Sequence, residues 1–220
     1  MTSSESTAAM PPKRADRAPD RFVTYIVGLC ETPRARAELR RGLGLPVERC
    51  NYLHRYLVPW THDRDDPAKE MHPDVKRAHY AVAALIAARP RAARATQPPG
   101  DGTSDAAGSG HPVRTDLGAS LGQAVFQGVM RPTTAESTLH LTSRQTADSV
   151  HAGLPALTRQ LLSGGIPVDW AVLLDDLAWW NRKRDRIATR WLDSYFRIAG
   201  TEPALENDTK THGTTEENER

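Results

Sequence analysis

The sequence predicts an all-α protein of roughly nine helices, arranged in two small helical bundles. Apolar residues recur at the three- and four-residue spacing of a helix along most of the chain, for example at Phe22, Ile26 and Leu29. No segment shows the sustained alternation of apolar and polar residues that a half-buried strand requires. The length of 220 residues suffices for one substantial domain or two small ones.

The first half of the chain contains four predicted helices. Asp20 has a side chain suited to an N-cap, and Thr32 followed by Pro33 is typical of a cap and a first helical turn. The second helix is expected to stop at Gly42 or Gly44. The four helices are expected at residues 20–29, 32–42, 46–59 and 74–89.

Five more helices are predicted after a segment that offers no core residues. This segment, 90–112, is rich in Pro, Gly, Ser and Ala, and forms either a mobile functional loop or a linker. The expected domains are an N-terminal bundle, 20–112, and a C-terminal bundle, 113–200. Residues 1–19 and 201–220 lack helical periodicity and are predicted to be disordered. The later helices are expected at 115–130, 135–141, 146–164 and 169–180, with a last one that ends at Phe196.

Charge is divided unevenly along the chain. The net charge is +2, but residues 201–220 contain six carboxylates and two basic side chains, a balance of −4, so residues 1–200 carry +6. A basic body favours a polyanionic partner. Of the 29 basic residues 24 are Arg, and this bias has a second explanation in the amino-acid usage of a GC-rich genome.

The sequence lacks the signatures of common catalytic and cofactor sites. It contains no phosphate-binding loop, no dinucleotide fingerprint, no GxSxG motif and no HExxH zinc motif. Cys30 and Cys50, the two cysteines, predict neither a disulfide framework nor a thiolate zinc site. No apolar run is long enough to cross a membrane, and no secretory signal opens the chain. We therefore expect a cytoplasmic protein that binds no cofactor and no metal.

Residues 165–180, GIPVDWAVLLDDLAWW, combine three tryptophans with three aspartates and resemble a site at first sight. Asp169 precedes a helix and is expected to cap its free N–H groups. Asp175 and Asp176 lie about 100° apart around the helix axis, so their carboxylates do not converge on one point. Trp179 lies off the apolar stripe of this helix. We therefore interpret the segment as scaffold and predict no catalytic residue in it.

Basic side chains crowd two of the predicted helices. Such a face is either simply solvated or a surface that binds nucleic-acid backbone through arginine donors, without sequence preference. The second helix carries Arg34, Arg36, Arg40 and Arg41. The last helix carries a stripe of Lys183, Arg186, Arg190 and Arg197, beside Arg182 and Arg184.

Three segments resemble the CasB family, the small subunit of the type I-E CRISPR interference complex, Cascade. The most specific is GIPVDWAVLLDDLAWWNRKRDRIATRWLDSYF, in which an Asp-Trp helix start is followed by a Trp pair, basic residues and a final amphipathic helix. RAELRRGLGLPVERCNYLHRYLV is similar to the family's Leu-Arg-Arg element, and DLGASLGQAV to its Leu-Gly helix. Together these segments touch both halves of the chain.

The resemblance implies a non-catalytic, all-helical subunit that binds RNA and DNA. Its expected partners are the guide RNA, the target and displaced DNA strands of the R-loop, the backbone and large subunits of Cascade, and a second copy stacked head to tail. No membrane partner is expected. The residues that the resemblance carries over are Arg40, Arg41, Lys183 and Arg184, to which Arg34 and Arg36 are added.

The sequence departs from the family pattern at two places in the second half. Ser137 and Thr138 stand where basic residues are common, and Pro155 follows Leu154 where the family has Leu-Arg. Pro155 is expected to kink or restart its helix. Both changes remove positive charge, and Arg144 or Arg159 is the candidate replacement.

Two other functions remain open at this point. The second and third predicted helices imitate a helix-turn-helix, so a DNA-binding transcription regulator is the main alternative. An enzyme of unknown chemistry rests only on the aspartates of residues 165–180.

Overall fold

The computed structural model describes residues 17–62, 71–90 and 114–200. These residues form eight α-helices and two short 3₁₀ helices and contain no β-strand, which confirms the predicted all-α class. Roughly nine helices were expected, and the last two of these correspond to the two arms of one long helix, Trp170–Ala199, which are separated by non-helical backbone at Lys183. Residues 1–16 and 201–220, which belong to the two ends predicted to be disordered, lie outside the described residues. Residues 17–19 are described, and the last two of them begin the first helix.

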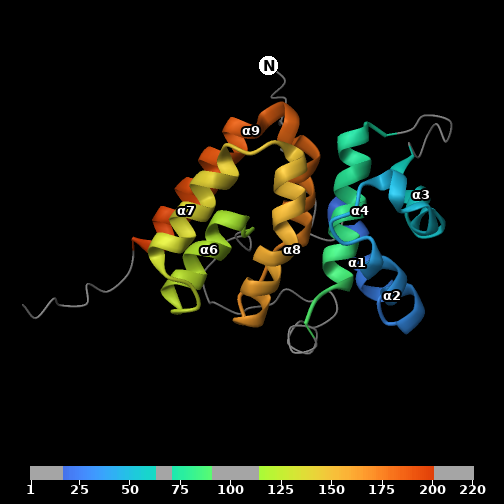
Figure 1. The fold of residues 1–220 in the computed structure, drawn as a ribbon, viewed down its shortest axis with the longest axis horizontal. Helices are drawn as coiled ribbons and strands as arrows, with labels where there is room; N and C mark the ends of the chain where they lie inside the picture. Colours follow the sequence, from blue (N-terminus) through green and yellow to red (C-terminus); the bar gives the residue numbers. More distant parts are fainter. Residues whose placement is uncertain (1–16, 63–70, 91–113, 201–220) are drawn as a thin grey trace, which may run out of the picture.

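The helices form two groups that lie side by side in Figure 1. One group consists of α1 (Ala18–Leu29), α2 (Pro33–Arg41), α3 (His54–Thr61) and α4 (Pro73–Ala87). The other consists of α6 (Leu117–Phe126), α7 (Pro132–Ser143), α8 (Ala147–Ser163) and α9 (Trp170–Ala199). Helix α9 packs against α6 and α7 of its own group and also against α4 and α1, so it joins the two groups.

One apolar core runs through both groups of helices. It extends from Phe22 and Ile26 in α1 to Trp191 and Tyr195 in α9, and all four side chains are at most 1% exposed. The division into domains 20–112 and 113–200 stays a prediction, because its boundary falls outside the described part of the chain. None of the helices in the described residues is both long and apolar enough to span a bilayer.

Several helix ends follow from local sequence. Asp169 caps α9 as predicted, because its carboxylate accepts from the backbone N–H groups of Ala171 and Val172 at 3.1 and 3.2 Å. Asp116 caps α6 in the same way. The predicted N-cap role of Asp20 is wrong, because α1 begins earlier, at Ala18, and Asp20 lies in its first turn.

The third predicted helix, 46–59, is wrong in its first half. The chain there forms two 3₁₀ turns, η2 (Val47–Arg49) and η3 (Asn51–Leu53), and α3 begins only at His54. Cys50, between the two turns, has φ −112° and ψ 30°, outside the helical region. Its side chain is buried in the core, and packing therefore overrides the helical periodicity of the sequence.

Pro155 was predicted to kink or restart its helix; α8 continues through it, so the helix does not restart there, and the kink stays a prediction. The expected consequence of a proline, loss of one backbone hydrogen bond, is tolerated inside a helix whose Leu154, Thr158 and Leu161 side chains are buried.

Helices α6 and α9 approach each other closely at two glycines of α6. A Cβ atom at Gly118 would stand 1.8 Å from the carbonyl oxygen of Trp191, and one at Gly122 would stand 2.9 Å from the Ile198 side chain. The Leu-Gly motif of α6 therefore has a packing role, since only residues without a side chain let α9 come this near.

Candidate nucleic-acid interface

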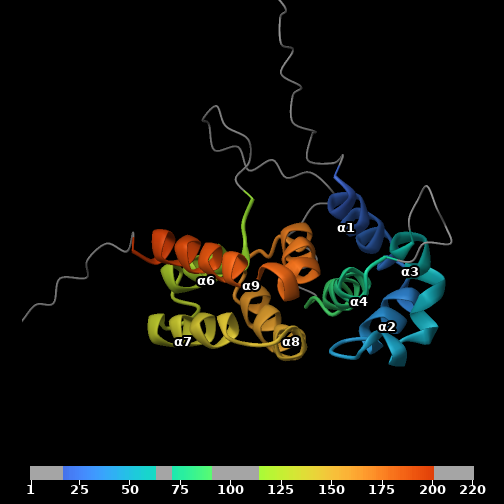
Figure 2. The same ribbon diagram turned by 90° about the horizontal axis from the view of Figure 1, so that it is seen from above.

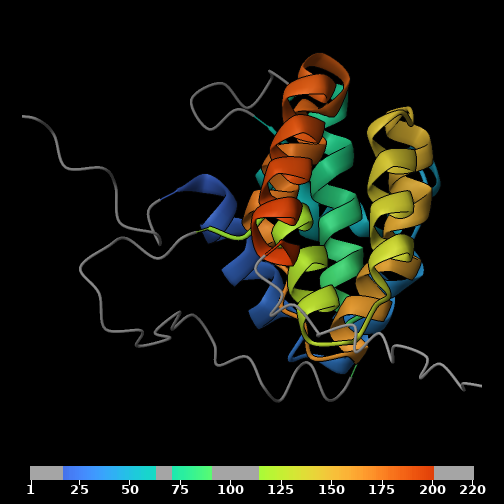
Figure 3. The same ribbon diagram turned by 90° about the vertical axis from the view of Figure 1, so that its left-hand side faces the viewer.

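Helix α9 bends at Lys183, and the bend exposes a basic segment. Lys183 has φ −134° and ψ 25°, which are non-helical values inside an otherwise helical run. Residues 181–186, here called the elbow, are all exposed, although buried tryptophans flank them on both sides. The two arms of α9 consequently run in different directions, as Figures 2 and 3 show.

Contacts between the two arms hold the bend. The rings of Trp180 and Trp191 lie with centroids 5.0 Å apart, although eleven intervening steps along a straight helix would separate their Cα atoms by about 16 Å. Asp176 on the first arm accepts a hydrogen bond from Trp191 Nε1 at 2.7 Å and another from Arg190 on the second arm. Both contacts are possible only because the helix folds back at Lys183.

The carboxylate of Asp176 lies in a buried polar network. Its side chain is 4% exposed, and burial raises its pKa, while the hydrogen bonds from Arg190 and Trp191 oppose that rise. Arg190 Nε also lies 3.4 Å from Asp116 Oδ2, and the same oxygen accepts from the Ser194 hydroxyl at 2.9 Å. Arg190 is therefore paired with two carboxylates although its side chain is 49% exposed, and fewer cations of the predicted stripe on α9 are free of a carboxylate partner than its sequence spacing indicates.

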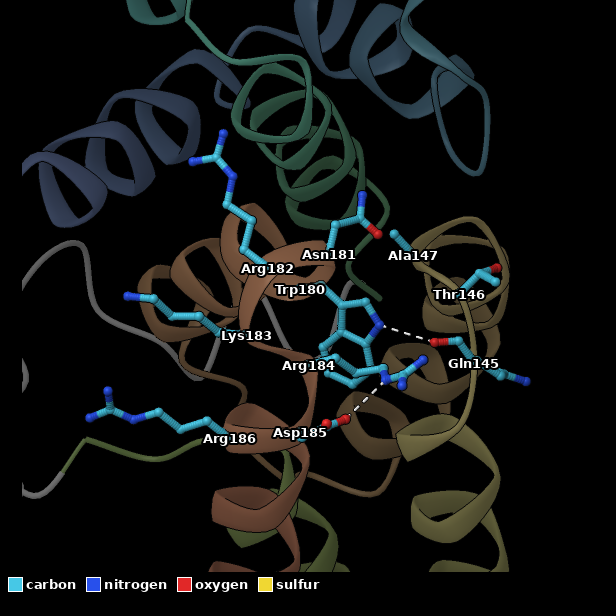
Figure 4. Close-up of a pocket in the computed structure, with 10 residues that line it drawn as sticks. All are labelled: Gln145, Thr146, Ala147, Trp180, Asn181, Arg182, Lys183, Arg184, Asp185 and Arg186. Carbon is cyan, nitrogen blue, oxygen red and sulfur yellow. Dashed lines mark hydrogen bonds and ion pairs between the residues drawn. The ribbon is translucent and has the colours of Figure 1, made fainter.

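A groove opens beside the elbow. It has a volume of about 550 Å³ and is lined by residues 180–186 of α9 together with Gln145, Thr146 and Ala147 from the α7–α8 connection. Trp180 anchors the two walls, since its Nε1 donates to the carbonyl oxygen of Gln145 at 3.2 Å. In Figure 4, Arg184 lies on the side facing Gln145, whereas Arg182, Lys183 and Arg186 point away from it.

The elbow carries a strong positive charge. It holds four basic side chains and one carboxylate, Asp185, which pairs with Arg184 at 3.2 Å. Arg182, Lys183 and Arg186 form no ion pair within the residues that the structure describes. Because Asp185 is 92% exposed, its pairing with Arg184 is weak and leaves that guanidinium accessible to another anion.

The second basic group lies on α2, and its members differ in availability. Arg34 pairs with Glu38 at 3.2 Å, and Glu38 also accepts from Arg55 and from Tyr56. The hydrogen bonds from Arg55, Tyr56 and Arg34 lower the pKa of Glu38 to about 2, so this carboxylate stays ionised and offsets Arg34.

The other arginines of α2 are less compensated. Arg40 and Arg41 are exposed at the end of α2 and form no ion pair within residues 17–62, 71–90 and 114–200. Cations in the last turn of a helix are also favoured by the helix dipole, so their position there has a local stabilising reason. Arg36 is half-buried near Cys30, whose pKa is raised by burial to about 11 despite the nearby Arg89 and Arg36.

The structure does not bring all the predicted site residues together. In Figure 1, α2 lies at the lower right, whereas the bend of α9 lies at the top. Arg144 is the C-cap of α7 and directly precedes Gln145, so it belongs to the neighbourhood of Lys183 and Arg184. The residues predicted for the site thus form two separate surfaces, the end of α2 and the elbow with the α7–α8 connection.

Some groove residues were not predicted as site residues. Gln145 and Thr146 line the groove but belong to a connection with no motif of its own, and only the fold places them opposite the elbow. Arg182 and Arg186 had a sequence signal, since they belong to the same basic run as Lys183. That Arg144 or Arg159 supplies the positive charge which is absent at Ser137 and Thr138 stays a prediction.

The alternative functions find little geometric basis. The carboxylates of the second half have structural partners: Asp175 pairs with Arg17 at 2.6 Å, and Asp176 accepts from Arg190 and Trp191. Among the described residues no group of three potential metal-ligating side chains gathers, and residues 63–70 lie outside them. A helix-turn-helix joins its helices by three or four residues, whereas residues 42–53, with two 3₁₀ turns, separate α2 from α3.

Residues 35–196, from α2 to near the end of α9, match the family described as CRISPR-associated protein Cse2 (CRISPR_cse2). The chain belongs to the Cse2 family. This confirms the resemblance to the CasB family, which is the same family under another name. No curated protein matches the chain.

Solved structures agree with membership of the Cse2 family. A chain described as "CRISPR RNA-guided surveillance complex" is 36% identical, with a TM-score of 0.68, over 84% of this chain and 94% of that one. A second, described as the same complex in a pre-nicking state, is 37% identical with the same TM-score and coverage. A Cse2 family protein from Thermus thermophilus is 22% identical with a TM-score of 0.56, over 81% and 97% of the two chains, and shows the shared fold.

Proposed function

We propose that this chain is the small, non-catalytic subunit of a type I-E CRISPR Cascade complex in the cytoplasm. In this role it contacts the backbone of the guide RNA and of the target and displaced DNA strands, and so stabilises the R-loop. The observation that carries the proposal is the likeness, at 36% and 37% identity over most of both chains, to chains of RNA-guided surveillance complexes.

The charge distribution supports contact with nucleic-acid backbone. Arg40 and Arg41 on α2, and Arg182, Lys183 and Arg186 at the elbow, are exposed cations without a carboxylate partner in the described parts of the chain. Such cations bind phosphates irrespective of sequence, which suits a complex in which base pairing with the guide reads the sequence. Strand exchange in an R-loop is nearly balanced, so a few phosphate contacts suffice to shift it.

Exposed apolar side chains support the proposed protein partners. Leu141 is 63% exposed and Phe126 is 55% exposed, in the α6–α7 group, while Leu45 and Tyr52 are 40% and 37% exposed near α2. Apolar side chains at both ends of the molecule suit contacts with the backbone subunits, the large subunit and a second copy of this chain.

The decisive experiment reverses two charges in the assembled complex. Arg40→Glu with Arg41→Glu is expected to speed dissociation of the R-loop, because two phosphate contacts become repulsive. The slope of log affinity against log salt is expected to fall by about two, close to one for each lost contact. The measurement is R-loop lifetime by strand-displacement fluorescence at several salt concentrations.

A charge-matched control separates this effect from a change in net charge. Arg21 and Arg131 are exposed, lie on α1 and at the N-cap of α7, and belong to neither basic surface. Arg21→Glu with Arg131→Glu changes the net charge equally and is expected to leave R-loop lifetime near that of the unaltered complex. Equal lifetimes for the two double variants would contradict a role of α2, and failure of the unaltered chain to enter the complex would contradict the proposed function.

A further inference from the structure

An aromatic side chain stands exposed beside the elbow. Trp179 is 41% exposed, whereas its neighbour Trp180 is 1% exposed in the core. Successive residues of a helix point about 100° apart, so Trp179 leaves the buried face that Trp180 occupies. Burial within the subunit therefore does not account for Trp179, and a large apolar ring remains open to a partner.

Cations gather on this ring. Lys183 Nζ lies 4.4 Å from the centroid of Trp179, and the guanidinium carbon of Arg182 lies 5.5 Å from it. Both side chains are exposed, and neither has an ion pair among the described residues. Lys183 and Arg186 point to the same side of α9 in Figure 4. The exposed indole and the cations of Arg182 and Lys183 thus form one patch, and Arg186 extends it on the side of Lys183.

This combination matches the chemistry of single-stranded nucleic acid. An unpaired base offers an apolar π-face to an indole, and the phosphates on either side of it offer charge to the surrounding cations. In a duplex the base faces are covered by their neighbours, so a duplex presents only its phosphates to the patch. A protein partner offers an apolar contact but no reason for three uncompensated cations around it.

We propose that Trp179, Arg182, Lys183 and Arg186 form a stacking site for an unpaired nucleobase and its flanking phosphates. The site rests on the proposed function and sharpens it, because it selects single strand over duplex at the elbow. The base displaces the cations from the indole face. A cation on an exposed ring contributes about two- to fivefold in equilibrium, whereas stacking a base contributes about five- to 150-fold, so the exchange favours the base.

The test compares two oligonucleotides that carry the same charge. One is an oligothymidylate of about 12 nucleotides, within the usual site size, and the other is an abasic strand of the same length. Binding to the full chain is followed by fluorescence anisotropy at low salt. The unaltered protein is expected to bind the thymidylate at least about fivefold more tightly than the abasic strand.

Three variants assign the difference to one ring. Trp179→Ala is expected to bind both strands equally, and Trp179→Phe to retain part of the preference. Phe196→Ala is the matched control, because Phe196 is 49% exposed on the same helix but thirteen residues beyond Lys183, and it is expected to keep the full preference. Since both rings are exposed, all three variants are expected to fold.

The outcomes distinguish this site from the proposed function. If the unaltered protein binds both strands equally and salt weakens both, stacking is refuted while backbone contact stands. If it binds neither strand, nucleic-acid contact by this subunit fails, and the stacking site fails with it. If Trp179→Ala keeps the preference but no longer enters the complex, the ring docks another subunit and the proposal is wrong.

Discussion

Replacing Asp176 by Ala tests whether a buried carboxylate holds the bend of α9. In the structure Asp176 joins the two arms of the helix by accepting from Trp191 Nε1 at 2.7 Å and from Arg190. Alanine removes both acceptors, and the indole N–H of Trp191, whose residue is 1% exposed, then has no partner in the core.

The expected cost follows from these two contacts. A buried donor left without an acceptor costs about 1–3 kcal/mol. The Arg190 side chain is 49% exposed, so loss of that ion pair adds at most about 1 kcal/mol, because water replaces the carboxylate. We therefore expect Asp176→Ala to lower the free energy of unfolding by about 1–4 kcal/mol, which lowers Tm by roughly 2–16 °C in a chain of this size.

Urea denaturation followed by circular dichroism measures the effect, with a constant m-value as the check that the denatured state is unchanged. Asp185→Ala is the matched control. This carboxylate also pairs with an arginine of α9 but is 92% exposed, so its loss is expected to change stability by less than about 0.5 kcal/mol.

A second background isolates the indole hydrogen bond. In Trp191→Phe the donor is absent. The loss of unfolding free energy caused by Asp176→Ala is therefore expected to be smaller in this background than in the unaltered protein, by about 1 kcal/mol or more. Equal stabilities of Asp176→Ala and Asp185→Ala would refute the reasoning. The same holds if the cost of Asp176→Ala is undiminished when Trp191 is Phe.

Two further predictions concern packing and pH. Gly118→Ala is expected to destabilise the chain by about 1–3 kcal/mol, because the added Cβ would meet the Trp191 backbone. Gly153→Ala is expected to stabilise it slightly, because a Cβ at this position inside α8 meets nothing within 4 Å. Thermal unfolding compares the two variants. Burial, with a smaller contribution from Arg77, lowers the pKa of His151 from 6.5 to about 4, so the unfolded state binds a proton first as pH falls. Stability from this group is complete above pH 6.5 and is lost as pH falls to about 4, by up to about 3 kcal/mol. His151→Leu is expected to flatten this part of the stability–pH curve, and an unchanged curve would contradict the assignment.

Local sequence rules predicted the helices whose ends are decided locally. Thr32 with Pro33 marks the start of α2, and Asp169 marks the start of α9, because a cap or a proline acts within one turn. The first helix begins before Asp20, at Ala18, with Pro19 in its first turn, and Asp20 has another role. Its carboxylate accepts from Arg114 at 2.6 and 3.0 Å, a partner 94 residues away that no local rule reveals.

The bend of α9 shows why the site was harder to predict than the fold. The basic run after Trp180 is plain in the sequence, but periodicity cannot tell two helices from one bent helix. Which cations remain available depends on distant carboxylates: Arg190 is taken by Asp176 and Asp116. The Cse2 family motif located the segment. Only the three-dimensional contacts showed that Arg190 is paired with carboxylates, whereas Arg182 and Arg186 have no such partner among the described residues.

The paired tryptophans also affect the entropy of binding. The elbow is bounded by Trp180 and Trp191, which are fixed in the core, so its backbone is already ordered before any ligand arrives. A strand that binds there restricts a few side-chain rotamers but no loop, and the ordering cost per phosphate contact is correspondingly small. A weak and sequence-independent contact of this kind can therefore form and release quickly without losing its geometry.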